Sequence, residues 1–130
     1  MTKLEFEKLP EWLPVRYKGR DYPYKISKYG KVKNLRGHIL KPYMWGQRKG
    51  SYPCVKLCLY GLQKVVDVHR LTAIHYVLNP RFKPEVNHLD LDHMNFVAYN
   101  LEWCTRSENE NHKYFMNAHL EFMKVASVWI

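Results

Sequence analysis

The residues best suited to chemistry lie between Glu85 and His112, where a histidine is surrounded by amides and carboxylates. His88 directly follows Asn87, and Asn109 and His112 lie three residues apart in a segment with a helical pattern. Residues three apart share a helix face, so both can point back toward His88. An imidazole, with an ordinary pKa of about 6.5, can take a proton from water near neutral pH. Amide oxygens beside it can hold a hard divalent cation, so this stretch has the layout for metal-assisted hydrolysis.

The surrounding pattern predicts the elements that position these side chains. Residues 85–87 and 100–104 form two short strand-like segments, and a polar loop rich in Asp and Asn joins them. After Thr105 the pattern becomes helical. A hairpin closed by this helix would gather His88 and the two asparagines around one small space.

Four short motifs occur in this part of the chain: VHRL at residues 68–71, PEVNH at 84–88, NLEW at 100–103 and TRSEN at 105–109. In order and spacing they resemble the HNH nuclease family, in particular the branch found among phage and intron homing endonucleases. The resemblance covers residues 65–113 strongly, and residues 11–60 resemble more loosely the DNA-binding module often placed ahead of such nucleases. It implies a ββα-metal unit in which His88 is the general base, Asn109 is a metal ligand and Asn100 closes the loop.

The resemblance also implies a divalent cation, Mg²⁺ or Mn²⁺, with Asn87 as a further ligand. Some relatives carry an aspartate at this position, whereas Asn87 offers only a neutral carbonyl oxygen. A carboxylate is the stronger ligand for a hard dication, so Asp90 or Asp92 could compensate. The remaining candidates are a cation that could clamp phosphate and two histidines that could contact phosphate or metal: Arg70, His93 and His112. For these histidines, a solvated turn or surface position is the alternative.

The charge distribution indicates a polyanionic partner. The formal net charge is +9 at pH 7; residues 16–64 contain 13 Lys or Arg and one acid, whereas residues 85–130 contain 3 basic and 7 acidic residues. A basic half that binds phosphate explains this asymmetry better than an ordinary solvated basic surface does. We therefore expect double-stranded DNA as the partner. The candidate DNA-binding residues are Lys25, Lys28, Lys31, Lys33, Arg36, Lys41, Arg48 and Lys49.

An α+β fold is expected, with a small antiparallel N-terminal sheet, a ββα-metal motif and a C-terminal helix. Residues 1–64 are predicted to form a basic DNA-binding module, and residues 65–130 the nuclease region. Apart from the hairpin above, the expected elements are strands at 22–27, 30–34, 38–42, 52–60 and 63–68, a loop near phosphate at 44–51 and a helix at 68–78. In that helix, Leu71, Ile74, His75 and Leu78 lie on one face.

Several classes of protein are excluded by the cysteine content and the hydropathy. Cys54, Cys58 and Cys104 form no CxxC pair, so we expect no structural zinc site and no disulfide framework. No apolar run approaches the roughly 20 residues needed to span a membrane, and the first residues lack the apolar core of a secretory signal. We expect a cytoplasmic protein of a phage-infected or host cell.

These observations predict a divalent-metal-dependent DNA endonuclease that, as the resemblance implies, leaves 5′-phosphate and 3′-hydroxyl ends. The alternative is a DNA-binding or accessory protein that keeps the fold with weak or no cleavage. A third interpretation is a structural component of a virion or complex. The C-terminal helix would pack on the body of the protein or bind a protein partner.

Overall fold

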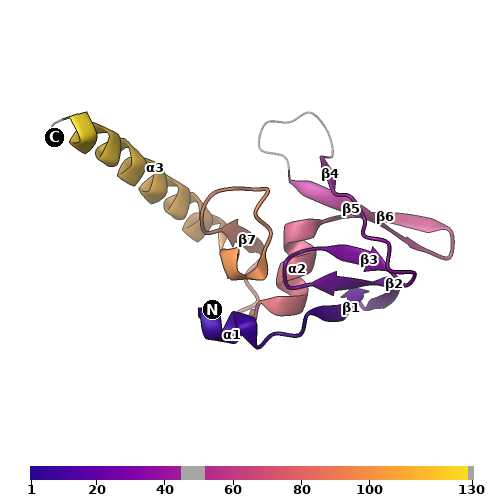
Figure 1. Cartoon of the computed structure of the whole chain (residues 1–130). Coiled ribbons are helices and arrows are strands. Elements are labelled where there is room, and N and C mark those ends of the chain that lie inside the picture. The colour runs from indigo at the N-terminus through magenta and orange to yellow at the C-terminus, as the bar shows by residue number, and fades with distance from the viewer. Residues whose placement is uncertain (45–51, 129–130) are drawn as a thin grey trace.

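The computed structural model describes residues 1–44 and 52–128, apart from the side chains of residues 122 and 124–128. It confirms the expected α+β fold, with short antiparallel strands and a long C-terminal helix that extends away from the body (Figure 1). In chain order the elements are α1 (Lys3–Glu7), β1 (Trp12–Tyr17), β2 (Arg20–Ser27), β3 (Val32–Asn34), β4 (Tyr43–Met44), β5 (Pro53–Leu59), β6 (Leu62–Asp67), α2 (Val68–Tyr76), β7 (Glu85–His88), the 3₁₀ turn η1 (Ala98–Asn100), β8 (Leu101–Cys104) and α3 (Arg106–Val128). The strands pair as β1-β2-β3, β4-β5-β6 and β7-β8.

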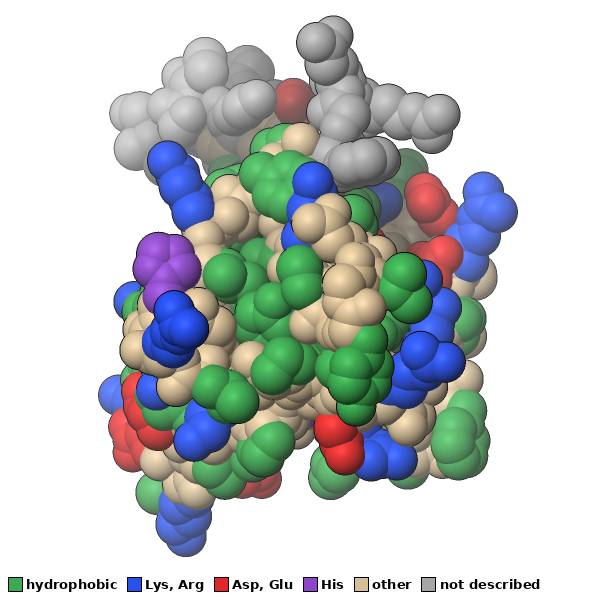
Figure 2. Space-filling model, turned by 90° about the vertical axis from the view of Figure 1, so that its right-hand side faces the viewer, with side chains coloured by type: hydrophobic (Ala, Val, Ile, Leu, Met, Phe, Trp, Pro, Cys, Tyr) green, Lys and Arg blue, Asp and Glu red, His purple; other side chains and the backbone are tan. Residues whose placement is uncertain are grey.

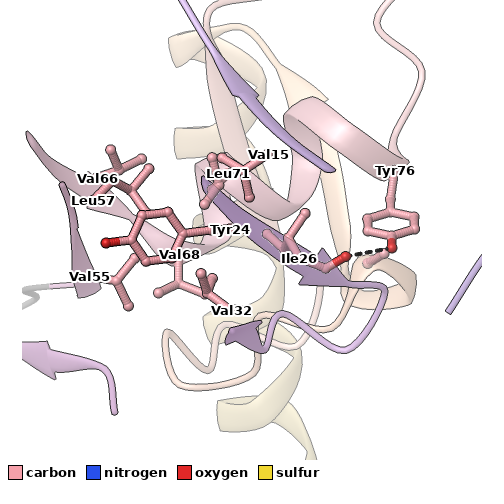
Figure 3. Close-up of a cluster of buried hydrophobic side chains, with 11 residues drawn as sticks. Val15, Tyr24, Ile26, Val32, Val55, Leu57, Val66, Val68, Leu71 and Tyr76 are labelled. Carbon is pink, nitrogen blue, oxygen red and sulfur yellow. Dashed lines mark hydrogen bonds between the residues drawn. The ribbon is translucent and has the colours of Figure 1, made fainter. Parts of the chain in front are cut away.

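The main hydrophobic core brings together side chains from β1, β2, β3, β5, β6 and α2 (Figure 3). Ile26, Leu57 and Leu71 are completely buried in it. Tyr76, at the end of α2, donates its hydroxyl hydrogen to the carbonyl oxygen of Ile26 at 2.8 Å. These contacts fix α2 against both three-stranded sheets. The core also takes residues from both sides of the predicted boundary at residue 64, which lies inside β6.

A smaller core attaches the β7-β8 hairpin to the opposite side of α2. Ala73, Val86 and Leu101 are buried there, with Val77 and Trp103 packed against them. The indole Nε1 of Trp103 donates to the carbonyl oxygen of Val77 at 3.0 Å, which holds the hairpin at the end of the helix. As a result, α2 lies between the N-terminal sheets and the hairpin that carries the candidate site.

One predicted strand is wrong. Residues 38–42 contain only an isolated bridge, between Ile39 and Lys33. The side-chain oxygen of Asn34 accepts hydrogen bonds from the backbone N–H groups of Arg36 and His38, both at 3.0 Å. These bonds turn the chain back along β3, where Leu40 N–H donates to the carbonyl oxygen of Val32 at 2.8 Å but no strand of residues 38–42 forms. The expected loop at 44–51 begins in β4, and its residues 45–51 lie outside the described residues.

The predicted helix at 68–78 is present but ends earlier and buries a different face. It ends at Tyr76, and Val77 is already extended, with φ −115° and ψ 119°. Leu78 is 92% exposed and Ile74 is 43% exposed, whereas His69 and Ala73 are buried. Two separate cores cover α2, so its buried surface is wider than the single stripe expected from the sequence.

The long helix α3 begins with a capping box. The hydroxyl oxygen of Thr105 accepts from the backbone N–H of Glu108, and the carboxylate of Glu108 accepts from the N–H of Thr105, both at 3.1 Å. Lys83 pairs with Glu108 at 2.8 Å and ties this helix start to the loop before β7. Farther along, Tyr114 and Phe115 are exposed. Of the helices that the structure describes, none could cross a membrane.

Candidate active site

The β7-β8 hairpin and the first turn of α3 bring the predicted site residues together. In the hairpin Asn87 lies opposite Glu102, and Glu85 lies opposite Cys104. Side chains of opposite residues point to the same face, so these four share one face of the ribbon. Asn109 meets this face: its Nδ2 donates to Glu85 Oε2 at 3.0 Å, and its side chain is buried.

Four predicted site residues, Asn87, His88, His93 and Asn109, line one small cavity. They enclose a space of about 10 Å³, with Tyr52 among its other lining residues. This space is comparable to that of a single water molecule or ion. The Nε2 atom of His88 is buried and has no hydrogen-bond partner among the described residues. A buried polar atom without a partner costs about 1–3 kcal/mol, so its position at this cavity indicates a group that binds or reacts there.

Three aromatic rings, those of Tyr52, His69 and His93, surround the ring of His88. The ring of Tyr52 lies 4.4 Å from that of His69 and 4.2 Å from that of His93, measured between centroids. His69 and His93 in turn lie 4.9 Å and 5.3 Å from His88. His69 comes from the first turn of α2, Tyr52 precedes β5, and His93 belongs to the loop between β7 and β8. Three separate parts of the chain therefore hold the His88 ring.

Burial keeps two of these imidazoles uncharged at neutral pH. It lowers the pKa of His88 to about 4; the neighbouring His93 adds to this effect, and Asp90 and Asp92 oppose it. Burial, followed by the charges of His88, Arg70 and His93, lowers the pKa of His69 to about 3. An uncharged imidazole has a free nitrogen lone pair, which is the form that accepts a proton from water.

The two asparagines present oxygen atoms that could hold a cation. Asn87 Nδ2 donates to Glu102 Oε1 at 2.9 Å, and Asn109 Nδ2 is held by Glu85. Within the described residues, no hydrogen bond reaches either Oδ1 atom. Nor do the described residues include a group of three or more His, Cys, Asp or Glu that could hold a metal ion. Neutral amide oxygens are nevertheless ligands of the kind that a hard divalent cation takes, so these two side chains would suit one.

The carboxylate of Asp90 organises the loop between β7 and β8. It accepts hydrogen bonds from Asn100 Nδ2 at 2.9 Å, from Asn95 Nδ2 at 2.8 Å and from the backbone N–H of Asp92 at 2.9 Å. Burial raises the pKa of Asp90, but these hydrogen bonds outweigh it and the pKa is lowered. The amide of Asn100 also accepts from the Asp90 N–H and donates to the Asn95 carbonyl. Asp92 accepts a hydrogen bond from the N–H of Met94. Asp90 and Asp92, the two carboxylates expected to compensate for the neutral Asn87, therefore both make hydrogen bonds within the loop.

Arg70 and His112 contact backbone carbonyls at the edges of the site. Arg70 donates to the carbonyl oxygen of Pro84 at 2.9 Å, and its guanidinium lies 5.6 Å from the centre of the Trp103 ring. His112 Nε2 lies 2.9 Å from the carbonyl oxygen of Leu89. Both side chains therefore support the hairpin, and their predicted contacts with phosphate or metal stay predictions.

A larger cavity of about 400 Å³ lies beside the small one and shares Tyr52 and Asn109 with it. Arg70, Arg106 and Lys113 contribute cations to its wall. Neither Arg106 nor Lys113 was among the site residues expected from the sequence. Both belong to the first two turns of the helix that carries Asn109, so their closeness to Asn109 in the sequence could have identified them. Nothing in the sequence near Tyr52 indicates that it lines the site, because Tyr52 lies far from His88 along the chain.

The predicted DNA-binding cations differ in exposure. Lys25, Lys31, Arg36 and Lys41 are exposed, and Lys33 lies over the ring of Trp12 at 3.9 Å. On the face shown in Figure 2, Lys and Arg side chains surround a central hydrophobic area. Arg48 and Lys49 lie outside the described residues.

Lys28 corrects the expectation of an exposed cation. Only 6% of it is exposed, and its Nζ donates to the carbonyl oxygens of Phe6 at 3.2 Å and Glu7 at 3.4 Å. The ammonium group thus binds carbonyl oxygens at the end of α1, where a positive charge is favourable.

Known proteins resemble this chain in sequence and in fold. The chain is 35% identical to an uncharacterized HNH endonuclease of Acanthamoeba polyphaga mimivirus over 104 residues, which are 79% of this chain and 31% of that protein. It is 32% identical to the DNA endonuclease I-HmuI of Bacillus phage SP01 over 100 residues, 76% of this chain and 55% of that protein. No family model matches.

The fold agrees with a solved structure of the HNH homing endonuclease I-HmuI, which binds and cleaves DNA. The TM-score is 0.70 at 27% sequence identity, over 91% of this chain and 68% of the other. The chain spans about a third of the mimiviral relative and about half of the phage relative.

Proposed function

Because the chain belongs to the HNH endonuclease family by sequence and by fold, we propose that it is a divalent-metal-dependent DNA endonuclease. The observation that carries the proposal is the small cavity lined by Asn87, His88 and Asn109, where a buried histidine nitrogen has no partner among the described residues. Hydrolysis of a phosphodiester requires a base for water and a positive charge near the leaving oxygen. These three side chains would provide the base and hold the charge.

His88 is the general base in this proposal. Its lowered pKa keeps the imidazole uncharged at neutral pH, so it can take a proton from the attacking water. Asn87 and Asn109 would hold the cation, Mg²⁺ or Mn²⁺. The bound cation would stabilise the charge that develops on the leaving oxygen. The products are 5′-phosphate and 3′-hydroxyl ends.

The basic surface would position double-stranded DNA at this site. Arg70, Arg106 and Lys113, in the wall of the larger cavity, are suited to phosphate contacts beside the reacting bond. The exposed cations of the N-terminal sheets would contact the backbone farther away. In this proposal residues 1–64 contribute mainly to DNA binding, and residues 65–130 carry out cleavage.

The decisive experiment is cleavage of supercoiled plasmid DNA by the purified protein. We expect nicked or linear product with Mg²⁺ or Mn²⁺, and none when the metal is removed by a chelator. Metal-dependent cleavage that persists unchanged in His88→Ala would contradict the assignment of the base. DNA binding without cleavage under any metal condition would instead support the accessory role.

A further inference from the structure

The two asparagines of the candidate site are held in the same way by two glutamates of the hairpin. Asn87 Nδ2 donates to Glu102 Oε1 at 2.9 Å, and Asn109 Nδ2 donates to Glu85 Oε2 at 3.0 Å. Glu102 lies opposite Asn87 on the neighbouring strand, and Glu85 lies two residues before Asn87 on its own strand. All four carboxamide and carboxylate groups therefore meet on one face of the β7-β8 ribbon.

The chemistry of these hydrogen bonds fixes the orientation of each amide. A carboxylate has no hydrogen to donate, so Asn87 and Asn109 must turn their NH₂ groups toward Glu102 and Glu85. The Oδ1 atoms then lie at the opposite end of each amide, where no hydrogen bond from the described residues reaches them. An amide rotated by half a turn would present its NH₂ group to a cation and repel it.

We propose that Glu102 and Glu85 are positioning residues, which orient Asn87 and Asn109 toward a divalent cation and provide the negative charge that these neutral ligands lack. The inference rests on the proposed function, because it concerns the same cation. Carboxylates that hold a ligand from behind both orient it and increase its basicity. Asp90 is less suited to this task, because its carboxylate already accepts three hydrogen bonds within its own loop.

Mn²⁺ binding to the full chain without DNA tests the proposal. Free Mn²⁺ can be followed by electron paramagnetic resonance, a readout that does not depend on cleavage. We expect Glu102→Gln and Glu85→Gln each to weaken binding by roughly 10- to 100-fold, as is typical when an outer carboxylate is lost. Glu102→Ala should weaken it further, because a glutamine oxygen can still accept the hydrogen bond and a methyl group cannot. The control is Glu110→Gln, because Glu110 makes no hydrogen bond to either amide; its effect should be much smaller.

An exchange of the two groups provides a rescue. Asn87→Asp alone would place two carboxylates within hydrogen-bond distance, so they would share a proton and gain little affinity for Mn²⁺. The double variant Asn87→Asp with Glu102→Gln has the same charge as the wild type and restores one hydrogen bond, in which the introduced glutamine is the donor. We expect it to bind Mn²⁺ at least as tightly as the wild type and more tightly than either single variant.

The metal-free protein gives an independent measurement. Side-chain NH₂ signals of Asn87 and Asn109 in nitrogen-edited NMR spectra should shift in Glu102→Ala and Glu85→Ala respectively, while thermal unfolding confirms that both variants fold. If the wild type binds Mn²⁺ and Glu102→Gln and Glu85→Gln bind it equally well, the inference is wrong and the proposed endonuclease is unaffected. If the wild type binds no Mn²⁺, both the cation site and this inference are overturned.

Discussion

The imidazole of His69 lies against that of His88, with ring centroids 4.9 Å apart and ring planes inclined by 41°. One ring comes from the first turn of α2 and the other from the end of β7, and both are buried. Two imidazoles in contact cannot both carry a proton without repulsion, and burial disfavours the charge on each. Protonation of this pair at low pH should therefore destabilise the fold at the candidate site.

We expect the free energy of unfolding to fall as the pH is lowered from about 6.5 toward 4. An unfolded histidine takes up its proton near pH 6.5, whereas folded His69 has a pKa of about 3. Between these values the unfolded state binds more protons, so acid favours unfolding. His69→Gln should reduce this slope by up to about 1.4 kcal/mol per pH unit. Urea unfolding at several pH values measures it, with His119→Gln, at an exposed position on α3, as the comparison.

His88→Ala should abolish most cleavage and preserve DNA binding. Loss of a general base typically lowers the rate by about 10²- to 10⁴-fold. Single-turnover cleavage of a plasmid, with binding measured in parallel, separates the two effects. His119→Ala is the matched control because it removes an imidazole from an exposed position on α3. A His88→Ala variant that also loses DNA binding would indicate a structural role for the ring.

Asn100→Ala should destabilise the loop between β7 and β8. Its side chain accepts one hydrogen bond and donates two, which link Asp90 to the Asn95 carbonyl. The partners left without it are partly buried, so we expect a loss of roughly 1–3 kcal/mol in the free energy of unfolding. Chemical denaturation measures the loss, and Asn117→Ala, at an exposed position on α3, provides the comparison. Equal stability of the two variants would contradict the proposed role.

Gly30→Ala should destabilise the protein more than Gly19→Ala does. Both glycines have a left-handed backbone, with φ of +81° and +77°, so both substitutions carry a similar conformational cost. Only at Gly30 would the new Cβ meet neighbouring atoms, 2.3 Å from a ring carbon and 2.8 Å from the carbonyl oxygen of Phe96. We expect an additional loss of about 1–3 kcal/mol from this crowding. Similar unfolding midpoints for the two variants would argue against the close contact.

DNA binding should weaken steeply with salt. Each phosphate contact by a cation contributes about −0.9 to the slope of log K against log salt concentration. We expect the double variant Lys31→Ala with Lys41→Ala to bind more weakly and to have a shallower slope than the wild type. Fluorescence anisotropy at several salt concentrations measures both. Lys8→Ala, which removes an exposed cation outside the basic segment, should have a smaller effect; a flat slope for the wild type would contradict binding through phosphates.

Local periodicity was sufficient to predict the parts of the site that are close in sequence. The strand-like segments at 85–87 and 100–104 and the helical spacing after Thr105 placed His88 and Asn109 on a hairpin and the helix that follows it. The structure confirms this arrangement, because a two-residue repeat in a strand and a 3.6-residue repeat in a helix determine which side chains share a face. The same information did not show how far a strand or helix extends, as residues 38–42 and the early end of α2 demonstrate.

The sequence by itself determined the chemistry of the site: a histidine, two amides and a basic segment in a fixed order along the chain. Only the tertiary structure decided which of these groups face one another. Tyr52 and His69 lie against one another and His69 lies against His88 because α2 is held between two cores. Lys28 is buried because the end of α1 packs against it. Periodicity shows which face of an element is apolar or polar. It does not show which distant element covers that face, since this depends on packing of the whole chain.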